Sequence, residues 1–259
     1  MSKSYRHIPV QLTRKIKLVM TDVDGTLNDG GEVLVPEIHR LIRRLEEIGV
    51  VVGLVSGRTL SRLKNMARDL DITGPIIAEN GGVAILQVDG ELVDLGYSRQ
   101  PALEAMEKLM KLFPGAVIGR EDNEERLIDV VVRSKGVSVS ELRKHVGDTQ
   151  LLDSGYLMHL MQRGISKGKT LQRLLELLPY ESLTTENVIA IGDSMTDISL
   201  FEFFPNSILV PSPRLSDEER QQLGATAGFV SDHSISEGFA EVVTRIVNAR
   251  TSDAISFDK

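Results

Sequence analysis

The sequence contains no cysteine, and this absence excludes disulfide bonds, thiolate nucleophiles and cysteine-bound metal sites. It also lacks any apolar run long enough to span a membrane, because its longest runs have the length of β-strands. Basic residues are outnumbered by acidic ones, 30 against 37, and the resulting formal charge of −7 argues against a nucleic-acid-binding surface. We therefore expect a cytoplasmic protein that binds neither nucleic acid nor membrane.

Size and composition are those of a soluble globular protein with more than one structural unit. The 259 residues can bury a substantial core, and they exceed one minimal domain. Hydrophobic residues make up 41% of the chain and charged residues 26%, which is typical of soluble domains. In so acidic a chain, any binding of phosphate must depend on local features.

The two ends of the chain give weak signals. Residues 1–15 contain four basic residues and no acidic one, which is a feature of organellar transit peptides. They lack the apolar segment of a secretion signal, so we interpret them as a frayed N-terminal arm. Residues 251–259 are interpreted as a flexible tail in the same way.

Two aspartates follow the first apolar run of the chain. Residues 16–21 predict a short buried strand, and Asp22 and Asp24 come directly after it. Residues two apart on an extended segment project to the same side, so both carboxylates can reach one reaction centre. Gly25 permits a sharp turn, and Thr26 adds a hydroxyl. Such a pair suits Mg²⁺, and a carboxylate beside that ion can attack phosphorus, although an acidic turn without chemistry is the simpler alternative.

Three later segments repeat this arrangement of an apolar run or amphipathic helix beside a polar group. Each supplies a different part of a site for phosphoryl transfer: a hydroxyl beside flexible backbone, a lysine at a positive helix end, and two further carboxylates. The polar residues are Ser56 and Gly57 after the run 50–55, Lys167 at the start of a helix through Leu178, and Asp193 and Asp197 after the run 188–191.

Taken in order, these segments resemble the four motifs of the haloacid-dehalogenase-like phosphatase superfamily: an Asp-x-Asp pair, a Ser or Thr, a Lys, and a Gly-Asp-x-x-x-Asp loop. One position departs from the pattern, because Thr196 stands where the family often has Asn. The resemblance implies Mg²⁺ as cofactor and the following roles: Asp22 as nucleophile and metal ligand, Asp24 as general acid/base and metal ligand through its backbone, Ser56, Gly57 and Lys167 as phosphate-binding residues, and Asp193 and Asp197 as further metal ligands.

The middle of the chain resembles one branch of that superfamily. Residues 75–83 are similar to the third core strand of phosphatases whose cap is inserted after the second motif, the type IIB arrangement. Within the branch, residues 153–167 look most like archaeal-type phosphoglycolate phosphatases. The resemblance implies hydrolysis of a small phosphorylated metabolite through a phosphoaspartyl intermediate. Sugar-phosphate phosphatases of the sucrose-phosphate or mannosyl-3-phosphoglycerate type, a phosphomutase and a non-catalytic phosphate-binding scaffold remain alternatives, and the oligomeric state stays open.

The order of predicted elements indicates an α/β fold. Strand-like runs alternate with helical patterns from residue 16 to residue 71, which is the signature of a parallel sheet, and the same rhythm returns after Lys167. Between them the pattern is α+β, beginning with a hairpin at residues 83–93. We therefore predict a Rossmann-like parallel-sheet core at residues 16–84 and 160–250, with an inserted α+β cap at residues 85–159.

The predicted helices and strands have definite positions. Helices are expected at residues 36–49, 59–70, 101–113, 139–145, 167–178 and 236–248, and strands at or near residues 16–21, 50–55, 75–83, 116–118, 127–132, 151, 156–161, 188–191, 208 and 229.

Several other polar residues have two interpretations each. Lys169 is expected to be solvated, because a helix places it on a different face from Lys167. Arg58 contacts either substrate or neighbouring acids, Asn80 either orients the site or completes a turn, and His159 either packs or binds substrate. The cap offers four arginines that could recognise a second anionic group, or that simply solvate a loop: Arg99, Arg120, Arg126 and Arg133.

Overall fold

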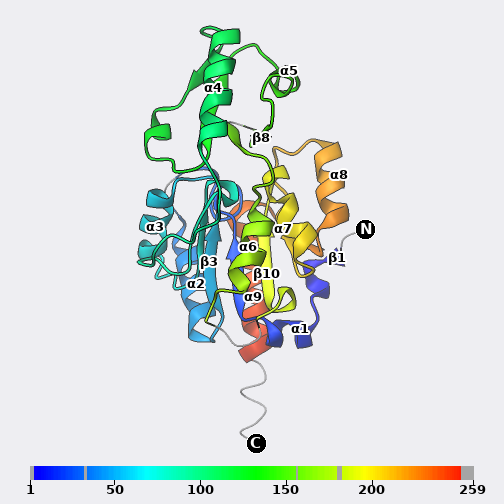
Figure 1. The fold of residues 1–259 in the computed structure, drawn as a ribbon. Helices are drawn as coiled ribbons and strands as arrows, with labels where there is room; N and C mark the ends of the chain where they lie inside the picture. The colour runs from blue at the N-terminus through cyan, green and yellow to red at the C-terminus, as the bar shows by residue number, and fades with distance from the viewer. Residues whose placement is uncertain (1–2, 32–33, 156, 180–182, 252–259) are drawn as a thin grey trace, which may run out of the picture.

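The computed structural model describes residues 3–31, 34–155, 157–179 and 183–251, which form a core and a cap (Figure 1). An eight-stranded sheet runs through the core, and all its neighbouring strands are parallel except the last pair. In spatial order the strands are β1 (Lys3–Ser4), β12 (Phe229–Val230), β11 (Ile208–Leu209), β10 (Val188–Gly192), β2 (Leu18–Thr21), β3 (Val51–Val55), β4 (Ile76–Ala78) and β5 (Val83–Ile85).

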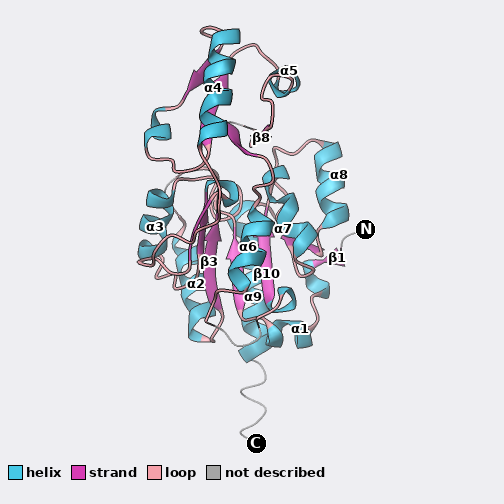
Figure 2. Ribbon diagram, viewed as in Figure 1, coloured by secondary structure: helices cyan, strands magenta, loops and turns pink. Residues whose placement is uncertain are grey.

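Helices flank this sheet on both faces (Figure 2). Successive side chains of β2 point to opposite faces: Val19 belongs to one apolar cluster, and Leu18 and Met20 belong to the other. Burial on both faces explains why the strands appear in the sequence as continuous apolar runs. The first cluster includes residues of α2 (Pro36–Glu47), α3 (Leu60–Asp69) and α9 (Ile235–Thr251), and the second includes residues of α6 (Lys167–Leu175), α7 (Ile198–Phe203) and α8 (Asp217–Thr226).

The cap is a separate antiparallel sheet of four strands with α4 (Gln100–Leu112) packed on one face. Its strands, in spatial order, are β6 (Val117–Gly119), β7 (Val130–Ser134), β9 (Met158–Gln162) and β8 (Thr149–Asp153). The short helices η3 (Glu121–Glu124) and α5 (Val139–Arg143) complete it. The predicted α/β fold with an inserted α+β cap is therefore confirmed.

The boundaries of the cap differ from the predicted ones at both ends. The cap was predicted to end at residue 159, but β9 continues to Gln162, which pairs with Thr149 of β8. The cap was predicted to begin at residue 85, yet β5 lies in the core sheet and Leu92 bridges back to Ile85. The predicted hairpin thus forms as part of the core, because Ala84 belongs to the second apolar cluster and Leu86 and Val93 pack against it.

The prediction of a frayed N-terminal arm is wrong for residues 3–15. Strand β1 pairs in parallel with β12, and α1 (Val10–Lys15) follows it. Between them Ile8 is buried in the core, where it packs in the same cluster as α9. Of the predicted tail, Thr251 is the last residue of α9, and residues 252–259 lie outside the described residues. No helix in the described ranges has the length and apolar character needed to cross a membrane.

Candidate active site

The acidic residues meet because they follow neighbouring strands. Strands β2 and β10 are paired in register, and the backbone N–H of Asp22 donates to the carbonyl of Ile191 at 2.9 Å. Since parallel strands end at the same edge of a sheet, Asp22 and Asp193 emerge side by side. Together with Asp197 they place one carboxylate oxygen each within 4.8 Å of the others.

Lys167 connects the two acidic loops. It is the first residue of α6, whose N-terminus is capped by the side chain of Ser166. Its side chain is 1% exposed, and Nζ lies 3.1 Å from Oδ1 of Asp22 and 2.7 Å from Oδ1 of Asp197. Lys169, by contrast, is exposed and its Nζ reaches only the carbonyl of Gly164. The structure therefore brings Lys167, and not Lys169, to the aspartates.

Asp193 and Asp197 have different surroundings. Oδ2 of Asp197 accepts hydrogen bonds from the backbone N–H groups of Asp193 and Ser194 at 3.1 Å, and Oδ1 accepts from Lys167. In contrast, Oδ1 of Asp193 is buried and has no hydrogen-bond partner among the described residues. A Cβ on Gly25, which has φ +89°, would lie 2.1 Å from Oδ2 of Asp193, so only glycine lets the two loops approach so closely.

Thr196 fills the position where the family often has Asn. Its hydroxyl lies 2.9 Å from Oγ of Ser194 and 3.4 Å from Nζ of Lys167. The hydroxyl of Thr196 is therefore within hydrogen-bonding distance of both the acidic loop and Lys167.

The charges of the cluster favour binding of a cation. Burial, with added repulsion from Asp197 and Asp24, raises the pKa of Asp22 to about 7 although Lys167 opposes the rise. Burial and the charges of Asp22 and Asp197 likewise raise the pKa of Asp193 well above its ordinary value. Burial lowers the pKa of Lys167, but the two carboxylates beside it outweigh that effect and raise it. One ammonium faces three carboxylates, and carboxylate oxygens are the donors that Mg²⁺ prefers.

Asp24 lies apart from this cluster and is held by Arg58. The guanidinium of Arg58 donates to both carboxylate oxygens of Asp24, at 2.9 and 2.6 Å, and to the carbonyl of Gly31 at 2.8 Å. Of its two predicted roles, Arg58 thus fills that of a partner for acids. Ser56 is 1% exposed at the end of β3, and its Oγ accepts from the backbone N–H of Arg58.

A cavity of about 730 Å³ joins these residues to the cap. The seven predicted site residues except Asp197 line it, and Asn80 and the cap's His159 line it as well. Three of the four cap arginines also reach it, although two of them are engaged: Arg120 pairs with Asp122, and the buried Arg126 pairs with Asp122 and Asp129. Arg99 instead donates to the carbonyl of Asn123. Arg133 is exposed.

Glu79 joins the core to the cap, a function that the sequence did not reveal. It is fully buried at the end of β4, and its carboxylate accepts from the backbone N–H groups of Leu127, Ile128 and Asp129 at 2.8 to 3.2 Å. Burial and the charge of Asp129 raise its pKa more than these hydrogen bonds lower it. β7 accordingly starts at Val130 and not at the predicted residue 127. A charged residue at the end of an apolar strand was the available signal.

Comparison with known proteins agrees with this arrangement. Residues 19–123 and 119–242 match the sequence model of the haloacid dehalogenase-like hydrolase family. A phosphoglycolate phosphatase from Methanothrix thermoacetophila is 32% identical over 234 residues, which cover 88% of this chain and 96% of that protein. One from Methanoculleus marisnigri is 30% identical over 236 residues, which cover 89% and 96%.

Solved structures agree as well. A Thermoplasma acidophilum protein of 26% sequence identity has a TM-score of 0.76, with 89% of this chain and 98% of that one covered. A haloacid dehalogenase-like hydrolase from Bacteroides thetaiotaomicron, at 19% identity and a TM-score of 0.67, shares the fold over 89% of this chain and 99% of its own. Because these matches run through both parts of the core and through the cap, the chain belongs to the haloacid dehalogenase-like hydrolase family and is a phosphatase.

Proposed function

We propose that this phosphatase uses Mg²⁺, forms a phosphoaspartyl intermediate and hydrolyses 2-phosphoglycolate. The observation that carries the mechanism is the hydrogen bond from Nζ of the buried Lys167 to Oδ1 of Asp22. Asp22 follows the C-terminal end of β2 and lines the cavity between core and cap. A carboxylate fixed beside an ammonium is oriented for attack on a bound phosphoryl group.

Asp22 and Asp193 would hold the metal ion through their oxygens, and the backbone of Asp24 would provide a further ligand, as in the family. The unpartnered, buried Oδ1 of Asp193 supports this assignment. Asp197 would act mainly by holding Lys167 and the loop, because both its oxygens accept hydrogen bonds. When bound, Mg²⁺ supplies positive charge that stabilises the transferring phosphoryl group.

The chemistry then needs two steps at Asp22. A carboxylate oxygen of Asp22 attacks phosphorus, and the bond to the ester oxygen breaks while Asp24 protonates that oxygen. Asp24 next takes a proton from a water molecule, which attacks the same phosphorus, releases phosphate and restores Asp22. For this acid/base role Arg58 must release at least one oxygen of Asp24.

The phosphoryl group would be bound by Lys167, the hydroxyl of Ser56 and the backbone of Gly57. The cap over these groups limits access of bulk water during the first step and must admit one water molecule for the second.

Phosphoglycolate is proposed as substrate because the relatives that share about 30% identity over most of this chain are phosphoglycolate phosphatases. The test is a comparison of kcat/KM for phosphoglycolate, glycerol phosphate, sucrose 6-phosphate, mannosyl-3-phosphoglycerate and hexose phosphates. We expect phosphoglycolate to give the highest value. A sugar phosphate that wins by tenfold, about 1.4 kcal/mol in transition-state binding, would overturn the substrate and leave the phosphatase standing. Full activity in excess chelator would contradict the metal requirement.

A further inference from the structure

Two buried side chains at the active-site cavity, Asn80 and His159, each have a hydrogen-bonding group for which the structure gives no partner among the described residues. Asn80 is 2% exposed, and its Nδ2 has no partner in the described part of the chain. His159 is 3% exposed, and the structure gives a hydrogen bond to one ring nitrogen only, Nδ1. Since a buried polar group without a partner destabilises the folded state, such groups point to a ligand.

Both side chains flank the same backbone position. A Cβ built on Gly57 would lie 2.9 Å from Nδ2 of Asn80 and 3.2 Å from Cε1 of His159. Asn80 comes from the core, directly after Glu79, whereas His159 comes from β9 of the cap. The absence of a side chain at Gly57 thus lets one polar side chain from each unit approach the same backbone position, and both side chains line the cavity that contains Asp22.

The orientation of the His159 ring is fixed by a hydrogen bond at Nδ1. Oδ2 of the fully buried Asp129 lies 2.7 Å from Nδ1, and Oδ1 of Asp129 lies 2.6 Å from Nη1 of Arg126. Burial raises the pKa of Asp129, but the hydrogen bonds and charges of His159 and Arg126 outweigh it and lower the pKa below its usual value. An ionised Asp129 therefore accepts from Nδ1–H and leaves Nε2 available to a ligand.

The same cluster ties the ring to the phosphate-binding loop, because Nη1 of Arg126 also donates to the carbonyl of Gly57 at 3.1 Å. His159 is thereby held in a defined position relative to the loop that is proposed to bind the phosphoryl group. Such rigid support is what a side chain needs if it is to discriminate between substrates.

We propose that Nδ2 of Asn80 and Nε2 of His159 bind a carboxylate on the leaving group, and so select phosphorylated hydroxy acids over phosphates of neutral alcohols. This inference rests on the proposed function. Two polar groups match the two oxygens of a carboxylate: Nδ2 of Asn80 is a donor, and Nε2 of His159 would donate to the second oxygen in the doubly protonated ring, with Nδ1–H kept on Asp129. The phosphoryl oxygens already have Lys167, Ser56 and Gly57 as partners, so these two donors are left for the other end of a short substrate.

The experiment compares kcat/KM for 2-phosphoglycolate with that for 2-hydroxyethyl phosphate, which has a neutral hydroxymethyl group in place of the carboxylate. Asn80→Gly removes the amide while suiting φ +54° at this position, and His159→Leu removes the imidazole. We expect each variant to lower the ratio of the two kcat/KM values at least tenfold. His159→Gln keeps a neutral donor on a similar side chain and should lie between wild type and His159→Leu.

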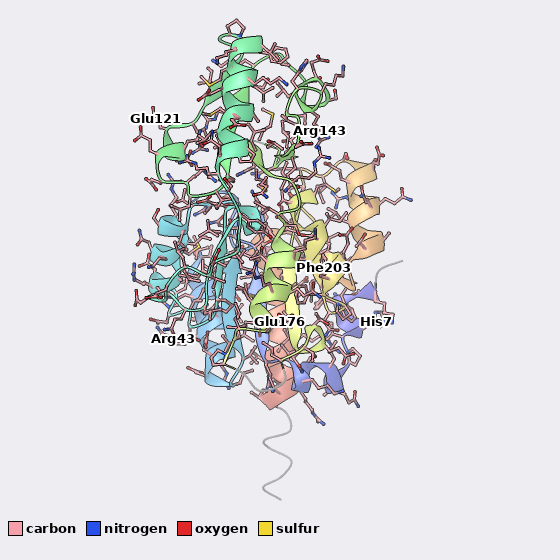
Figure 3. All side chains as sticks on the ribbon, viewed as in Figure 1. His7, Arg43, Glu121, Arg143, Glu176 and Phe203 are labelled. Atoms are coloured by element: carbon pink, nitrogen blue, oxygen red, sulfur yellow. The ribbon has the colours of Figure 1, made fainter. Side chains whose placement is uncertain are left out.

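Two further variants serve as comparisons. His145→Gln changes another cap histidine, which bonds to Glu141 at 3.1 Å and does not line the cavity, and it should leave the ratio unchanged. His145 follows α5 in the sequence, and Arg143 at the end of α5 lies on the opposite side of the cap from Glu121 of η3 (Figure 3). Arg133→Met removes the exposed arginine that also lines the cavity, and its ratio should change less than threefold.

Three results would overturn the inference: an unchanged ratio in the Asn80 and His159 variants, equal losses on both substrates, or a large fall in the ratio for Arg133→Met alone. The first two would leave the proposed function intact if wild type still favours phosphoglycolate. If wild type hydrolyses neither compound, the proposed function fails. In that case calorimetry measures the dissociation constants of the two compounds for wild type and variants. The carboxylate site is supported if the Asn80 and His159 variants lose the preference for 2-phosphoglycolate, and it is rejected if they keep it.

Discussion

Replacing Lys167 by Met tests whether one buried ammonium organises the acidic centre. The change keeps a long flexible side chain and removes the positive charge that Asp22 and Asp197 share. The two carboxylates remain buried, at 4% and 0% exposure, with no lysine to compensate them. We expect both activity and stability to fall.

The size of the effect follows from the burial. Removing one partner of a buried ion pair costs about 3–5 kcal/mol, and 1 kcal/mol shifts the melting temperature of a protein of this size by about 2–4 °C. The expected decrease is therefore roughly 6–20 °C. Loss of one preorganised donor to the transferring group should lower kcat by about 100-fold or more.

The loss of stability in Lys167→Met should also depend on pH. Lys167 lowers the pKa of Asp22 and of Asp193, so its removal raises both further above the ordinary value of 3.8. A carboxyl group whose pKa is higher in the folded than in the unfolded state lowers the free energy of unfolding of the protein as the pH rises between the two pKa values. In wild type this window for Asp22 ends at about pH 7, and in the variant it extends higher. The difference in melting temperature should thus be larger at pH 8 than at pH 5.5.

The assay is thermal unfolding at the two pH values, without added metal, together with hydrolysis of p-nitrophenyl phosphate. Lys169→Met is the matched control, because it makes the same chemical change two residues away on an exposed side chain. It should leave both measurements near those of wild type. A decrease below 2 °C for Lys167→Met at pH 8, or equal decreases for the two variants, would refute the reasoning.

Three shorter predictions follow from the same geometry. Asp22→Asn should reduce turnover to background with the fold retained by circular dichroism, and a tenth of normal turnover would show that another residue is the nucleophile. Mg²⁺ should release protons on binding below about pH 7, where Asp22 is protonated, so equal binding enthalpies in buffers of different ionisation enthalpy would contradict this competition. Gly57→Ala should lower the melting temperature and also lower kcat/KM for phosphoglycolate at least tenfold, because its Cβ would lie 2.9 Å from Nδ2 of the buried Asn80 and 3.2 Å from Cε1 of His159 and would displace them; unchanged kinetics would show that the position of these two side chains does not affect turnover.

The central part of the structure could be predicted because its signals are local. An apolar run of strand length that ends in a carboxylate fixes both the strand and the edge of the sheet at which the carboxylate lies. For this reason Asp22 and Asp193 could be expected to meet, whereas Lys167, more than 140 positions from Asp22, was expected beside them from the resemblance to the family. Helix α2 followed in the same way from its apolar spacing and from Gly49, which has φ +76° just beyond its end.

The features that escaped prediction depend on contacts between distant segments. No local pattern shows that Lys3 pairs with Phe229, or that Arg58 reaches both oxygens of Asp24. The same holds for Glu79, whose partners are backbone groups nearly 50 positions away that carry no sequence signal of their own. Such polar contacts use groups that every residue has, so only the folded chain identifies them.

The core and the cap each supply residues to the active-site cavity. The residues proposed to bind phosphate and metal lie at strand and helix ends of the core, where rigid neighbours fix them. The cap reaches the same cavity through His159, and it is anchored there by Glu79 and by the bond from Arg126 to Gly57. These anchors join backbone atoms to buried charges and fix the position of the proposed leaving-group contacts relative to the core. In the proposed scheme, therefore, substrate selectivity depends on His159 of the cap and Asn80 of the core together, while the phosphoryl-transfer chemistry is assigned to the core alone.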